Sequence, residues 1–138
     1  MIYLDASAIV ALVMPEPHTA ALDTWLTDIG DEPVTSQLAI TEVARAIVRS
    51  GRPEAAAQVA QLGGLALRAG SREIRALPAT TDVLVAAGRL PPPTLRSLDA
   101  IHLATALALG PALRTLVTYD VHQAAAARSL GLTVHAPG

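Results

Sequence analysis

Short apolar segments alternate with longer segments of mixed polarity along the whole chain. The short ones are typical of buried strands, and they cover residues 2–4, 33–36, 72–77, 115–120 and 132–136. The longer ones repeat apolar residues every three or four positions, which predicts helices over residues 7–14, 18–30, 37–51, 81–90, 97–110 and 121–131. Strands that alternate with helices form a parallel sheet covered on both faces, so the pattern predicts an α/β fold.

Residues 53–70 predict a further helical segment. This part of the chain is rich in alanine and leucine, which favour helices, and it contains the adjacent pair Gly63 and Gly64. We therefore expect a helix that the glycine pair interrupts.

Composition indicates one globular domain over residues 1–138. Hydrophobic residues make up 51% of the chain and charged residues 16%, a balance that supports a buried core and excludes a disordered chain. No cysteine is present, which rules out disulfides and thiolate metal sites. The first residues lack a basic segment, and Asp5 interrupts their apolar stretch, so no signal peptide is expected. No segment is long and apolar enough to span a bilayer, so we predict a cytoplasmic protein without a membrane partner.

Four of the twelve acidic residues are expected at one edge of the sheet. Asp5 and Asp120 come at the ends of predicted strands, and Glu42 lies in the helix after the second strand. Asp99 opens a helix that is apolar on nearly all sides and is therefore expected to be buried. In parallel α/β sheets, ligand sites lie beyond the carboxyl ends of the strands. The sequence therefore predicts that these four carboxylates converge on one site.

Each acid also has a purely structural interpretation, and these alternatives stay open. Asp5 and Asp120 are suited to cap the helices that follow them, a contribution of about 1 kcal/mol each. Glu42 is three residues before Arg45 on a helix face, where a surface ion pair contributes about 0.3–0.5 kcal/mol. Asp99 suits the first turn of its helix, where the helix dipole favours an acid.

Taken together, the acids point to a divalent cation. Carboxylates that face one cleft repel each other, and a cation between them removes that repulsion. Oxygen donors suit Mg²⁺ or Mn²⁺, whereas Zn²⁺ prefers histidine or cysteine, and the four histidines lack metal-ligand spacing. Ser7 and Thr118 lie two residues from Asp5 and Asp120, where a hydroxyl can support a ligand or contact a phosphate.

Several other chemistries are disfavoured. The net charge of -2 argues against a protein that coats nucleic acid non-specifically, but it is compatible with a nuclease that binds phosphates through metal ions. All ten basic residues are arginine, which disfavours receiver domains and haloacid-dehalogenase phosphatases because these place a lysine beside their carboxylates. Neither a G-x-S-x-G elbow nor a GxxxxGK[ST] loop is present.

Four blocks of the sequence stand in an order that is typical of one protein family. They are "MIYLDASAIVALV", "TSQLAITEVARAI", "LRSLDAIHLATAL" and "LVTYD". This arrangement resembles PIN-domain nucleases, and more narrowly the VapC toxins of bacterial type II toxin–antitoxin pairs. The resemblance covers the whole chain and assigns the family's acid positions to Asp5, Glu42, Asp99 and Asp120.

The resemblance implies a three-layer α/β/α fold with a central parallel sheet. It implies an endoribonuclease that depends on Mg²⁺, with Mn²⁺ able to replace it, in which metal-activated water attacks an RNA phosphodiester in line. The four acids would hold one or two ions and carry the catalysis. We expect Asp5 and Asp99 to be direct ligands, and Glu42 and Asp120 to be direct or bound through water.

The resemblance also implies partners. They are the RNA substrate, a second copy in a homodimer, and a cognate VapB-type antitoxin whose tail enters the active-site groove. Arg45, Arg49 and Arg96 are near the acids in the sequence and are candidates for phosphate contacts. Three alternatives stay open: a PIN-domain nuclease of RNA maturation or turnover, a catalytically silent PIN-like interaction module, and cleavage of DNA.

Overall fold

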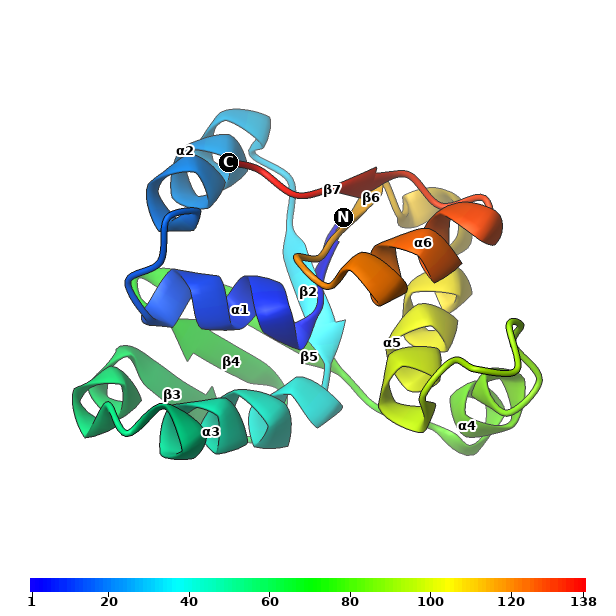
Figure 1. The fold of residues 1–138 in the computed structure, drawn as a ribbon, viewed down its shortest axis with the longest axis horizontal. Coiled ribbons are helices and arrows are strands. Elements are labelled where there is room, and N and C mark those ends of the chain that lie inside the picture. Colours follow the sequence, from blue (N-terminus) through cyan, green and yellow to red (C-terminus); the bar gives the residue numbers. More distant parts are fainter.

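The computed structural model describes the whole chain, Met1–Gly138, which is built around one seven-stranded sheet (Figure 1). The strands are β1 (Ile2–Leu4), β2 (Pro33–Ser36), β3 (Val59–Leu62), β4 (Ala66–Ala69), β5 (Arg72–Leu77), β6 (Thr115–Val117) and β7 (Val134–His135). The α-helices are α1 (Ala6–Val13), α2 (Thr19–Ile29), α3 (Leu38–Ser50), α4 (Thr81–Ala87), α5 (Ser97–Ala108) and α6 (Val121–Ser129). Two short 3₁₀ helices, η1 (Pro53–Gln58) and η2 (Gly110–Ala112), complete the chain.

Two apolar cores lie on opposite faces of the sheet and produce three layers, as predicted. Side chains alternate along β1, so Ile2 and Leu4 pack on the face covered by α1, α2 and α3. Tyr3 points to the other face, where it packs with α5 and α6. Figure 1 shows these two groups of helices on either side of the sheet. Because β1 is covered on both faces, all three of its residues are buried.

The strand order explains why the acids gather. The sheet has the order β3-β4-β5-β2-β1-β6-β7, and β5, β2, β1, β6 and β7 are parallel. Leu4 at the end of β1 pairs with Val117 at the end of β6, and β2 lies on the other side of β1. The segments that leave these three strands therefore start next to one another at one edge of the sheet.

The prediction of an interrupted helix over residues 53–70 was wrong. Only η1 is helical, and β3 and β4 form an antiparallel hairpin that continues the sheet beyond β5. Gly63 and Gly64 form its turn with φ values of +61° and +73°, which glycine adopts without the steric cost of a Cβ. Leu67 and Ala69 point into the core and Arg68 points to solvent, so burial on one face of a strand outweighs the helix propensity of this segment.

The remaining predicted elements occur, with different ends. The predicted strand 115–120 ends at Val117, because the chain then turns to start α6, and the last strand is reduced to Val134 and His135. α5 is buried along most of its length, as its apolar sequence predicted. No helix has the length and apolar character needed to cross a membrane.

Candidate active site

Asp5 is a buried helix cap at the edge of the sheet where β1, β2 and β6 end. It follows β1, is 5% exposed, and its Oδ1 accepts the backbone N–H of Ala8 at 3.1 Å in the first turn of α1. Oδ1 also accepts from the Ser7 hydroxyl at 2.6 Å, and Oδ2 accepts from the Thr118 hydroxyl. Burial raises the pKa of Asp5 above its usual value, and these three hydrogen bonds oppose the increase. No arginine or histidine forms an ion pair with this carboxylate.

Ser7 and Thr118 tie Asp5 to the end of β6. The Ser7 hydroxyl accepts the backbone N–H of Tyr119 at 2.9 Å, and the Thr118 hydroxyl accepts that of Asp120 at 3.1 Å. Both hydroxyls therefore serve two purposes, since they donate to Asp5 and accept from the segment that carries Asp120. In this arrangement they support the Asp5 carboxylate, one of the two roles that the sequence left open for them.

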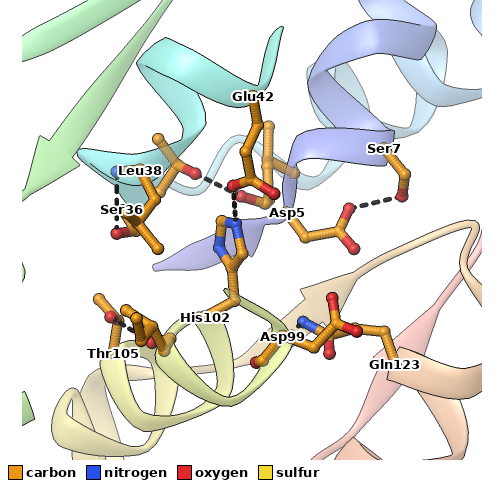
Figure 2. Close-up of polar contacts among 12 residues, drawn as sticks. Asp5, Ser7, Ser36, Leu38, Glu42, Asp99, His102, Thr105 and Gln123 are labelled. Carbon is orange, nitrogen blue, oxygen red and sulfur yellow. Dashed lines mark hydrogen bonds and ion pairs between the residues drawn. The ribbon is translucent and has the colours of Figure 1, made fainter. Parts of the chain in front are cut away.

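Glu42 is held by a histidine and not by an arginine. Its Oε1 lies 2.5 Å from Nε2 of His102, which rises from α5 beneath it (Figure 2). The surface ion pair with Arg45 that its helix position suggested is absent. The sequence predicted no metal-ligand spacing for the four histidines, and it gave no indication that His102 contacts one of the acids. Its spacing of three residues from Asp99, which puts both on one face of a helix, is the signal that could have revealed it.

Asp99 is an unpaired acid beside two others. It lies in the first turn of α5, is partly buried, and its carboxylate has no hydrogen-bond or ion-pair partner. Burial raises its pKa, and so do the negative charges of Asp120 and Glu42, while His102 and Arg96 act in the opposite direction. Such a carboxylate is destabilised by its surroundings, so a cation placed next to it would be bound favourably.

Asp120 caps α6 from a more exposed position. Its Oδ1 accepts the backbone N–H groups of His122 at 2.8 Å and Gln123 at 3.0 Å, which confirms the capping interpretation. Both cap bonds go to one oxygen, so Oδ2 has no partner within the chain.

Two hollows are lined by three of the four acids, and Asp5 lines neither of them. One has a volume of about 440 Å³ and is lined by residues from α1 and α3, among them Ser7, Glu42, Arg45 and Arg49. The other has a volume of about 880 Å³ and lies between the loop before α5 and α6, with Arg96, Asp99, Asp120 and His122 in its wall. Each hollow thus combines acids with arginines, and none of the three arginines forms an ion pair.

Comparison with known proteins agrees with this architecture. The family model described as PIN domain matches residues 2–129. Ribonuclease VapC47 of Mycobacterium tuberculosis (strain CDC 1551 / Oshkosh) is 38% identical over 142 residues, covering 100% of this chain and 98% of the relative. Ribonuclease VapC46 of M. tuberculosis (strain ATCC 25618 / H37Rv) is 43% identical over 136 residues, covering 99% and 97%.

The chain belongs to the PIN-domain family. The resemblance inferred from its four sequence blocks is thereby confirmed, and so is the three-layer fold that it implied. In this PIN domain the sheet is parallel except at the edge formed by β3 and β4.

The donor atoms of this PIN domain fit a cation that prefers oxygen. Asp5, Asp99 and Asp120 carry carboxylates without a cationic partner, and the nearby hydroxyls are engaged with Asp5. The side chains do not form a complete ligand set as they stand, because no three Asp, Glu or His residues converge closely enough to hold a metal ion. A set of three or four protein ligands would therefore require that some of these carboxylates move closer together.

Gln123 is a second polar residue near the acids that the sequence pattern did not reveal. It is 1% exposed, and its Nε2 makes only a long contact of 3.5 Å with the backbone oxygen of Asp99. Its Oε1 is buried without any partner. Nothing in the alanine-rich sequence of α6 signals that a glutamine there is buried next to an acid, as Figure 2 shows.

We expect Gln123→Met to stabilise the metal-free protein. The substitution keeps the length of the side chain and removes an amide oxygen without a partner, whose burial costs about 1–3 kcal/mol, at the loss of the one long Nε2 contact. A gain of about 1 kcal/mol would raise Tm by about 4 °C in a chain of this size. Thermal unfolding of Gln123→Met beside Gln58→Met, an exposed position in η1, measures this. A fall in Tm confined to Gln123→Met would show that Oε1 is satisfied in solution.

Proposed function

We propose that this chain is a metal-dependent endoribonuclease, the toxin of a VapBC-type toxin–antitoxin pair, with one nuclease domain over residues 1–138. The observation that supports this most strongly is similarity over the whole chain to proteins named Ribonuclease VapC, together with four acids at one sheet edge. The acids are Asp5, Glu42, Asp99 and Asp120. They would hold one or two Mg²⁺ ions, with Mn²⁺ as a substitute.

The individual carboxylates suit different roles. Asp99 lacks any partner and is the best candidate for a direct ligand, and Asp5 is fixed by its two hydroxyl donors and its cap bond. Glu42 offers Oε2, because only its Oε1 is hydrogen-bonded, and Asp120 offers Oδ2. A divalent ion held by these carboxylates would lower the pKa of a water molecule and neutralise charge on the scissile phosphate.

The residues of the chain contribute orientation and charge. Asp5 is locked between α1 and β6, so its carboxylate does not need to be ordered when substrate binds. Arg45 and Arg49 line the hollow that contains Glu42, and Arg96 lines the hollow that contains Asp99 and Asp120. An RNA backbone that passes from one hollow to the other would place a phosphodiester over the acids and its neighbouring phosphates beside the arginines.

A catalytically silent module is the less favoured alternative. In such a protein, Asp99 would remain unpaired beside Asp120 and Glu42 without any benefit, although its surroundings raise its pKa. The proposed partners are RNA, a VapB-type antitoxin and a second copy of the chain. Exposed apolar side chains on the outer helices, such as Leu84 and Val85 of α4, are compatible with such contacts.

Cleavage of a mixed RNA pool by antitoxin-free protein tests the proposal. We expect cleavage with Mn²⁺ or Mg²⁺, none with EDTA, and recovery when excess Mg²⁺ follows the EDTA, because the acids alone cannot activate water. A single-stranded DNA of matched sequence, incubated in parallel, decides whether the activity is restricted to RNA. Cleavage that persists in EDTA would contradict the metal-dependent mechanism. Folded protein that neither binds Mn²⁺ nor cleaves would favour the silent module.

A further inference from the structure

A buried chain of two hydrogen bonds connects the middle of the sheet to Glu42. Tyr3 of β1 is fully buried, and its Oη lies 2.7 Å from Nδ1 of His102. The other ring nitrogen, Nε2, lies 2.5 Å from Oε1 of Glu42. The His102 side chain is 1% exposed and that of Glu42 is 23% exposed, so the chain leads from the core to the rim of the site. Figure 2 shows the imidazole directly beneath the carboxylate.

With a neutral imidazole at His102, the chemistry of the three groups fixes the direction of these bonds. A carboxylate can only accept, so Nε2 must carry the hydrogen that it donates to Glu42. The phenol of Tyr3 has a hydrogen to donate, and Nδ1 of the neutral ring has a lone pair to accept it. Tyr3 thereby selects the tautomer that presents an N–H to Glu42. The tyrosine and histidine rings also meet edge to face, with centroids 5.8 Å apart at 79°.

The hydrogen bond from His102, which Tyr3 holds in turn, restricts the side chain of Glu42. Glu42 has three rotatable bonds and lies on α3 at the wall of a hollow, with Arg45 one turn along the helix. Of its two oxygens, only Oε1 is hydrogen-bonded, and the bond comes from a ring held in the core. Oε2 is therefore oriented without being occupied, which is the arrangement a positioned metal ligand requires.

We propose that His102 is a positioning residue that holds Glu42 ready for the cation, and that Tyr3 sets the tautomer of His102. The inference rests on the proposed function of the four acids and adds the two residues that orient one of them. His102 acts only through Glu42 and does not itself touch substrate.

Two substitutions of His102 separate this role from simple packing. Gln places its amide nitrogen near the position of Nε2, so His102→Gln keeps a donor for Glu42. Asn reaches only as far as Nδ1, so His102→Asn keeps a partner for Tyr3 and loses the bond to Glu42. Groups that orient metal ligands typically change affinity by about 10–100-fold when they are lost. We expect His102→Asn to weaken Mn²⁺ binding by about this factor, and His102→Gln to recover most of it.

The experiment is calorimetric titration of Mn²⁺ into RNA-free protein, followed by kcat and KM for RNA cleavage. In His102→Asn we expect kcat to fall with the Mn²⁺ affinity while KM for RNA changes by less than about threefold. The loss should disappear in a Glu42→Gln background, because a residue that acts through Glu42 has no effect once that carboxylate is gone. His135→Asn, the same change at an exposed residue of β7, is the control and should bind Mn²⁺ as wild type does.

Other outcomes overturn the inference in distinguishable ways. Equal Mn²⁺ affinity in wild type and His102→Asn, or equal losses in the Asn and Gln variants, would reduce His102 to a core residue while the proposed function stands. If His102→Asn fails to fold, Tyr3→Phe removes one buried hydroxyl and must lower Mn²⁺ affinity for the inference to survive. Wild-type protein that neither binds Mn²⁺ nor cleaves RNA would overturn both proposals.

Discussion

Asp99→Asn is expected to reduce RNA cleavage by on the order of a thousand-fold or more while the protein stays folded. The substitution keeps the shape of the side chain and removes only its charge. No hydrogen bond or ion pair is lost, because the Asp99 carboxylate has none. Loss of a group that acts only on the reacting centre typically costs this much in kcat. The comparison of kcat for the two proteins at saturating Mn²⁺ measures it.

The same substitution, Asp99→Asn, should raise the free energy of unfolding of the metal-free protein while it lowers activity. Burial and the charges of Asp120 and Glu42 raise the pKa of Asp99, so neutralising it relieves repulsion in the metal-free protein. Asp82→Asn is a matched control, since Asp82 is exposed and also lies in the first turn of a helix, α4. We expect it to retain full activity. Substantial cleavage by Asp99→Asn would show that this acid is a helix-dipole partner and not a ligand.

The main architecture could be predicted from the sequence because its parallel strands are buried on both faces. Such strands appear as short apolar runs, and the helices between them show a clear repeat, so all five parallel strands were found. The hairpin of β3 and β4 was missed because its residues are mostly alanine, leucine and glycine, which carry little strand preference. Its structure depends on pairing with β5, a contact that local sequence does not encode.

The candidate site was predictable only in part, and for a related reason. The sequence pattern identifies three of the acids as charges at the ends of apolar elements: Asp5, Asp99 and Asp120. The pattern does not identify His102, because the role of this residue depends on its hydrogen bonds to Tyr3 and Glu42, which are 99 and 60 positions away in sequence. A histidine in an apolar helix is usually a satisfied core residue, and this one is satisfied, but by an acid of the site.

The sequence allowed two roles for Asp5, helix cap and metal ligand, and the observed hydrogen bonds are compatible with both. The cap bond and the bond from Ser7 both go to Oδ1, while Oδ2 faces Thr118. A carboxylate oxygen has two lone pairs, so Oδ1 is fully used by its two bonds, whereas Oδ2 accepts only from Thr118 and keeps a lone pair for a cation. Stability and metal binding must therefore be measured separately to decide what this residue contributes.

Asp5→Asn should separate the two roles. Asparagine caps helices about as well as aspartate, so the metal-free variant should be at least as stable as wild type at pH 7.5. Burial raises the pKa of Asp5 in the folded protein, so wild type binds this proton more tightly when folded and loses stability as the pH rises through that pKa. The variant has no such group, and its metal-free stability should depend less on pH.

Mn²⁺ should then distinguish the two proteins by thermal unfolding. At about 100 times its Kd, an ion that binds only the folded state adds about 2.7 kcal/mol, which is several degrees in Tm. We expect this gain in wild type and in the control Asp28→Asn, an exposed acid of α2, but little or none in Asp5→Asn. An equal gain in Asp5→Asn would make Asp5 a helix cap alone and leave the cation to the other three acids. A loss of several kcal/mol in the metal-free variant would instead show that this position requires a carboxylate, because the amide NH2 group that replaces Oδ2 cannot accept from Thr118.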